Sequence, residues 1–81
     1  MIVNVQLFAR AKDLAGADRI SLDVPTGATV GALRRRLAET RPGLTALLAR
    51  SALAVDGEFA NDALVLADGA EIALLPPVSG G

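Results

Sequence analysis

The sequence contains no cysteine and no histidine, and two phenylalanines are the only aromatic residues among its 81 positions. The missing thiol and imidazole groups exclude disulfide bonds, thiolate nucleophiles, imidazole acid-base catalysis and nearly every transition-metal site. The carboxylates, hydroxyls and cationic groups that remain do not have the spacing of any catalytic motif. We therefore predict a chain that is not catalytic alone and that holds no metal and no cofactor.

Long apolar runs and clustered basic charge are also scarce. No stretch approaches the ~20 apolar residues that span a bilayer, and the first residues lack the pattern of a signal peptide. With 52% hydrophobic residues and a net charge of -1, the composition is that of a folded domain without electrostatic attraction for nucleic acid. The arginines at 34–36 are the one cationic cluster, and we interpret them as a solvated helix face. We expect one cytoplasmic domain that binds neither nucleic acid nor a membrane.

The first half of the chain predicts two strands and two helices. Apolar and polar side chains alternate in residues 2–8 and 19–24, which is the pattern of half-buried strands. Residues 9–17 favour a short helix between these strands. The main helix begins after Thr29, whose hydroxyl can cap it, and ends at the Pro-Gly pair 42–43.

The second half predicts a short helix, a hairpin and a last strand. Residues 44–50 suit one or two helical turns packed on the core. The hairpin turns at Asp56-Gly57, because this pair favours the positive φ angles of a type I′ turn. Residues 71–75 are apolar enough for the centre of a sheet, and the prolines at 76–77 end this strand by removing two backbone donors. The order of elements indicates an α+β roll.

The chain ends in an unusual segment, Pro-Pro-Val-Ser-Gly-Gly at 76–81, which has no charged side chain. Fully extended, six residues span about 20 Å, enough to carry the carboxylate of Gly81 into a pocket of another protein. Gly80 and Gly81 lack Cβ, so their backbone fits a narrow channel. Chemistry on a main-chain carboxylate needs no catalytic side chain. We predict a globular domain at 1–75 and a flexible tail at 76–81, with a frayed end as the alternative.

Three segments, at residues 7–16, 53–57 and 66–81, resemble the ubiquitin-like sulfur carriers of the MoaD and ThiS type. The Pro-Pro-Val-Ser-Gly-Gly ending is the most specific of them, and it is most similar to MoaD-type small subunits of molybdopterin synthase. The resemblance covers the whole chain. It implies a β-grasp (ubiquitin-like) fold, in which a mixed sheet is packed by one main helix.

The resemblance also implies a mechanism. In that family a MoeB-type enzyme uses ATP to adenylate the terminal glycine, and sulfur then replaces AMP to give a thiocarboxylate. Carried onto this chain, Gly81 would bear the sulfur and a MoaE-type large subunit would use it, in a heterotetramer of two small and two large subunits. Two loaded carriers would supply the dithiolene sulfurs of molybdopterin from cyclic pyranopterin monophosphate. ATP belongs to the activating enzyme, so no cofactor is implied for the carrier.

A second group of residues is implied for partner binding. Phe8 and Leu75 both fall on the side of their strands that otherwise carries polar residues. The resemblance places these two and Phe59 in a docking patch for the large subunit, with burial of Phe59 under the loops as the alternative. The residues assigned to partner binding are Phe8, Phe59, Leu75, Pro76, Pro77, Val78, Ser79 and Gly80.

Other functions share this fold and ending. Carriers that serve thiamine or cysteine synthesis have the same tail, although ThiS-type chains tend to be shorter and to lack Pro-Pro, which favours the molybdenum branch. The chain also departs from many relatives at Asp56-Gly57 and at Leu74-Leu75, where asparagine and aromatic residues are frequent. A ubiquitin-like protein modifier and a purely structural interaction module are the alternatives from other functional classes.

Overall fold

The computed structural model describes residues 1–77, which form a five-stranded sheet and the helices that pack on it. The strands are β1 (Ile2–Leu7), β2 (Arg19–Asp23), β3 (Ala52–Val55), β4 (Glu58–Ala60) and β5 (Glu71–Leu75). The helical segments are α1 (Ala9–Ala15), α2 (Val30–Thr40), the 3-10 turn η1 (Pro42–Leu44) and α3 (Thr45–Leu48). Each predicted helix and strand is present, with small shifts at its ends. None of these helices is long and apolar enough to cross a membrane.

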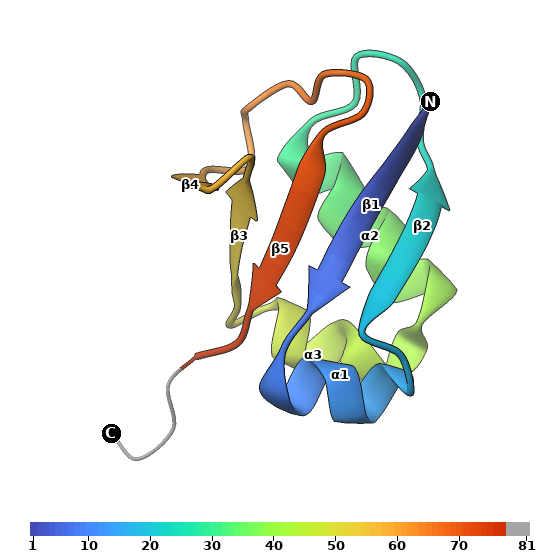
Figure 1. The fold of residues 1–81 in the computed structure, drawn as a ribbon, viewed down its shortest axis with the longest axis vertical. Helices are drawn as coiled ribbons and strands as arrows, with labels where there is room; N and C mark the ends of the chain where they lie inside the picture. The colour runs from blue at the N-terminus through green and yellow to red at the C-terminus, as the bar shows by residue number, and fades with distance from the viewer. Residues whose placement is uncertain (78–81) are drawn as a thin grey trace.

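The sheet is mixed, with the strand order β2-β1-β5-β3-β4 (Figure 1). β1 and β5 are parallel, and the other neighbouring pairs are antiparallel. As its apolar sequence predicts, β5 lies at the centre, and its Ile72 and Leu74 are 1% and 0% exposed. A mixed sheet with one main helix is the β-grasp arrangement, so the predicted fold class is confirmed.

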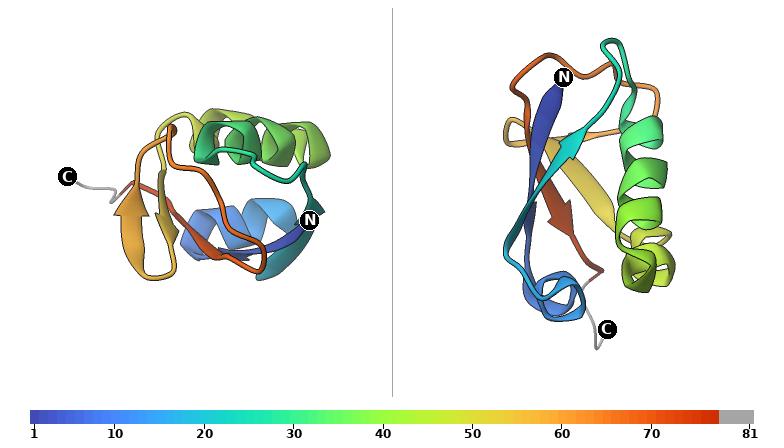
Figure 2. Two further views of the ribbon diagram at one scale, coloured as in Figure 1. Left: turned by 90° about the horizontal axis from the view of Figure 1, so that it is seen from above. Right: turned by 90° about the vertical axis from the view of Figure 1, so that its right-hand side faces the viewer.

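The core is one layer between the sheet and α2. Thr29 caps α2, because its hydroxyl oxygen accepts a hydrogen bond from the amide of Ala32 at 3.2 Å. The buried side chains of α2 recur at helical spacing and face the inward residues of the strands. The main members of this layer are Val3, Val5, Leu7, Val30, Leu33, Leu37, Leu44, Leu48, Leu53, Ile72 and Leu74. Figure 2 shows α2 on this face, while no helix of residues 1–77 covers the opposite face.

The β3–β4 hairpin turns at Asp56 and Gly57, with φ of 50° and 87°, as a type I′ turn requires. The Asp56 carboxylate accepts a hydrogen bond from the amide of Glu71 at 3.1 Å. The amide of Asp56 in turn donates to the carbonyl of Glu71 at 2.8 Å. The tip of the hairpin is therefore fastened to the first residue of β5, which helps to fix the register of β3 on β5.

The interpretation of the arginine cluster as solvated is wrong for Arg34. Its guanidinium donates hydrogen bonds to the carbonyls of Leu48 and Ser51, the latter at 3.0 Å, and forms an ion pair with Asp62 at 3.2 Å. These contacts join α2 to the end of α3 and to the loop after β4. Arg35 and Arg36 are exposed, as predicted. The difference arises because Arg34 lies nearest the buried stripe, so its long side chain reaches carbonyls that have no strand partner.

Replacement of Arg34 by alanine is expected to lower the free energy of unfolding by about 2 kcal/mol, because it removes charge-assisted hydrogen bonds to the carbonyls of Leu48 and Ser51. Urea denaturation followed by circular dichroism measures the change. Arg35→Ala is the matched control on the same helix, and it should alter stability by no more than about 0.5 kcal/mol. Equal effects of the two substitutions would contradict the structural role assigned to Arg34.

Candidate functional site

The site begins where β5 leaves the sheet. Because β1 and β5 are parallel, they end at the same edge of the domain, beside α1 (Figure 1). Leu75 pairs with Ala52 as the last paired position of β5. Pro76 is half-buried and Pro77 exposed, and neither has an amide hydrogen to continue the sheet. The predicted residues Val78, Ser79, Gly80 and Gly81 lie outside the described residues, so the boundary between domain and tail stays a prediction.

Strand pairing brings small and large apolar residues together on the uncovered face. Ala73 of β5 is opposite Ala54 of β3, and Ala54 is opposite Phe59 of β4. Paired residues project from the same face of a sheet, here the face turned away from α2. Neighbouring strands are about 4.8 Å apart, which places Phe59 about 10 Å across the sheet from Ala73. We name Phe8, Ala54, Phe59, Ala73 and Leu75 the outer apolar cluster.

The accessibility of this cluster varies among its members. Phe59 is 78% exposed and Phe8 is 43% exposed, whereas Ala73 and Leu75 are half-buried and Ala54 is buried. The alternative that Phe59 is buried under the loops is therefore wrong. Sequence reasoning missed Ala54 and Ala73, because an alanine alone carries no signal of a surface. The available clue was that Glu71, Ala73 and Leu75 occupy every second position of β5 and therefore share one face.

The other half of the uncovered face is polar. Arg19 forms an ion pair with Glu71, with nitrogen to oxygen distances of 3.3 and 3.5 Å. The Ser21 hydroxyl donates a hydrogen bond to the side-chain carbonyl of Asn4 at 2.8 Å. The face is thus divided into a polar half and an apolar half, and the apolar half is the one beside Pro76. A protein that covers the apolar half would also contact the point where the chain leaves β5 at Pro76.

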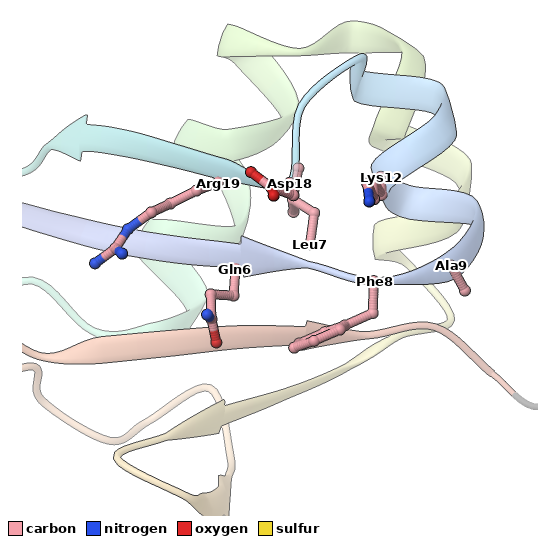
Figure 3. A pocket seen from close by; sticks show the side chains of 7 residues that line it. All are labelled: Gln6, Leu7, Phe8, Ala9, Lys12, Asp18 and Arg19. Carbon is pink, nitrogen blue, oxygen red and sulfur yellow. The ribbon is translucent and has the colours of Figure 1, made fainter.

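The position of Phe8 depends on a strained turn. Phe8 is extended, with φ of -125° and ψ of 154°, and the next residue, Ala9, has φ of 51°. A left-handed conformation costs an alanine roughly 1–2 kcal/mol. The turn directs the chain out of β1 into α1, so Phe8 lies directly after the last residue of β1. Figure 3 shows its ring turned toward β5.

Comparison with known proteins gives matches over nearly the whole chain. The model of the ThiS family matches residues 5–81. The chain is 33% identical over 79 residues to the molybdopterin synthase sulfur carrier subunit of Arabidopsis thaliana, a match that covers 98% of this chain and 82% of that protein.

Solved structures extend the likeness to the whole fold. SAMP1, small archaeal modifier protein 1 from Haloferax volcanii, superposes with a TM-score of 0.90 at 31% identity, covering 100% of both chains. A chain from the complex of subunits 1 and 2 of the molybdopterin-converting factor of Helicobacter pylori superposes with a TM-score of 0.71 at 28% identity, again covering 100% of both chains. These matches span both the sheet face and the segment that follows β5.

Proposed function

We propose, from the premise that this chain belongs to the ThiS family, that it is the sulfur-carrier subunit of a molybdopterin synthase. The observation that carries the proposal is the similarity to the Arabidopsis sulfur carrier subunit over 98% of this chain. The outer apolar cluster beside the point where the chain leaves β5 supports it, because a carrier must dock with its end directed into the active site of another protein.

In this proposal the reactive group is the carboxylate of Gly81. A carboxylate is a poor electrophile, so a MoeB-type adenylating enzyme first joins it to the AMP portion of ATP and releases pyrophosphate. A sulfide-level nucleophile such as hydrosulfide then attacks the acyl carbon and AMP leaves, which produces the thiocarboxylate. Two loaded carriers supply the two dithiolene sulfurs of molybdopterin. The chain holds no cofactor itself and contributes no catalytic side chain, and these steps belong to a cytoplasmic pathway.

The partner in sulfur transfer is a MoaE-type large subunit. The Helicobacter pylori structure that this chain resembles contains subunits 1 and 2 in one complex, which supports a two-subunit assembly here. Phe8, Phe59 and Leu75 contact the large subunit in this proposal, and Pro76 to Gly80 lead the carboxylate into its pocket. Enclosure of that segment would hold the sulfur in attack geometry and exclude water. We infer a heterotetramer with two small and two large subunits.

The decisive test is the mass of the intact protein. Incubation with ATP, the adenylating enzyme and a sulfur donor is expected to add the mass of one sulfur in place of one oxygen. Fragmentation should place the change at Gly81, and the same spectrum establishes whether Gly81 is the last residue. Omission of ATP is the control, since no leaving group then forms. An unchanged mass with active enzyme present would refute the proposal. A loaded protein that cannot support molybdopterin formation would instead indicate a carrier for thiamine or cysteine synthesis.

A second candidate is a protein modifier, favoured by the likeness to small archaeal modifier protein 1. A modifier would join Gly81 to lysine amines of other proteins through isopeptide bonds. Such conjugates would resist reductant and would disappear on deletion of Gly81. Immunoblots of cell extract against this chain distinguish the two candidates, because a dedicated sulfur carrier gives no high-mass bands.

A further inference from the structure

A hollow of about 440 Å³ lies at the corner where β1, α1 and β2 meet. Phe8 lines this hollow (Figure 3). Because Phe8 also belongs to the outer apolar cluster, the hollow and the cluster share this side chain. A protein that covers Phe8 therefore reaches the hollow as well. The side chains that give the hollow its chemistry are Gln6, Phe8, Lys12, Asp18 and Arg19.

The two cations of the hollow differ in whether they have an ion-pair partner. Arg19 already has a carboxylate partner in Glu71, at 3.3 Å. Lys12 is exposed, and no carboxylate of residues 1–77 lies within 4.0 Å of its ammonium. Figure 3 shows the carboxylate of Asp18 turned away from Lys12. Lys12 is therefore the cation in this hollow that has no counter-charge in the described part of the chain.

A partner that covers the hollow removes water from the Lys12 ammonium. A desolvated charge without a partner is costly, whereas a carboxylate placed against it offsets the lost hydration and orients the two proteins. We propose that this hollow is the charged part of the large-subunit interface, an inference that rests on the proposed function. The large subunit inserts an aspartate or glutamate side chain against Lys12, while the outer apolar cluster provides the apolar contact.

Lys12 is the only lysine of the chain, which permits a sharp footprinting experiment. The only other primary amine is that of Met1, which lies near Asp23 and Val24, at the opposite end of β1. Acetic anhydride is applied to the free chain and to its complex with the large subunit. Acetylation of Lys12 is expected to slow at least fivefold in the complex, while that of the Met1 amine is unchanged. Equal protection of both amines, or none of Lys12, would overturn the inference.

Charge reversal tests the acidic partner directly. Lys12→Glu is expected to raise the Kd for the large subunit about tenfold or more at low salt, and to reduce the dependence of Kd on salt. Lys12→Arg keeps the charge and should bind within about twofold of the original protein. Arg35→Glu is the matched control, because it makes the same charge change on exposed α2, in a different hollow.

Failure of this inference can be distinguished from failure of the proposed function. If the unaltered chain binds the large subunit but Lys12→Glu binds no more weakly than Arg35→Glu, the acidic contact does not exist and the proposed function stands. If the unaltered chain does not bind the large subunit at all, the proposed function and this inference both fail. Calorimetric titration at two salt concentrations gives every value needed.

Discussion

Deletion of Gly81 is expected to abolish molybdopterin formation completely. The shortened chain would still end in a carboxylate, but that group would lie one residue, about 3.5 Å, short of its position in the active site of the partner. A misplacement of 1 Å can already cost about 100-fold in rate, so a whole residue should leave no measurable turnover. The assay is molybdopterin formed by the carrier, the large subunit and the activating system together.

Two further variants separate the effect of tail length from the effect of side-chain size at residue 81. Addition of one alanine after Gly81 moves the carboxylate beyond its site and should be equally inactive. Gly81→Ala keeps the length and adds only a methyl group. It should lose activity if the channel of the partner is too narrow for a Cβ atom. Melting temperatures are measured for all three, because a lost fold would also abolish activity. Wild-type turnover by the shortened chain, with Gly81 verified as absent, would contradict a reactive carboxylate at this residue.

Local sequence signals explain why the fold could be predicted. The strands at the beginning alternate, the cap at Thr29 and the turn at Asp56-Gly57 have defined side-chain chemistry, and β5 is apolar enough for the centre of a sheet. Each of these signals agrees with the same β-grasp arrangement. Local and global preferences that agree in this way are what make a short chain predictable.

The features that could not be predicted depend on contacts between distant residues. Arg34 donates to carbonyls 14 and 17 positions further along the chain, and no periodicity encodes that reach. The outer apolar cluster needs the register that sets Ala73 opposite Ala54, which a shift of one residue would destroy. The chemistry at Gly81 came from the family resemblance, since a bare Gly-Gly pair is equally compatible with an ordinary chain end.

Phe8→Asp is expected to weaken binding of the large subunit about 100-fold. Phe8 lies between Leu75 and the hollow at Lys12, so it is central to the proposed interface. A few central residues account for most of the binding energy of an interface, about 2 kcal/mol or more each. Phe59 lies on β4, at the edge of the sheet, and there water can still reach its ring. For Phe59→Asp we therefore expect a smaller loss, about tenfold.

The order of these two effects tests where the interface is centred. Val65→Asp is the matched control, because Val65 is 60% exposed and is bridged to Thr29 at the beginning of α2, far from Phe8. It should bind the large subunit as the original protein does. A larger loss from Phe59→Asp than from Phe8→Asp would move the centre to the β3–β4 hairpin, away from Pro76. The segment after β5 would then leave the domain at the rim of the interface, where a partner could not enclose it against water.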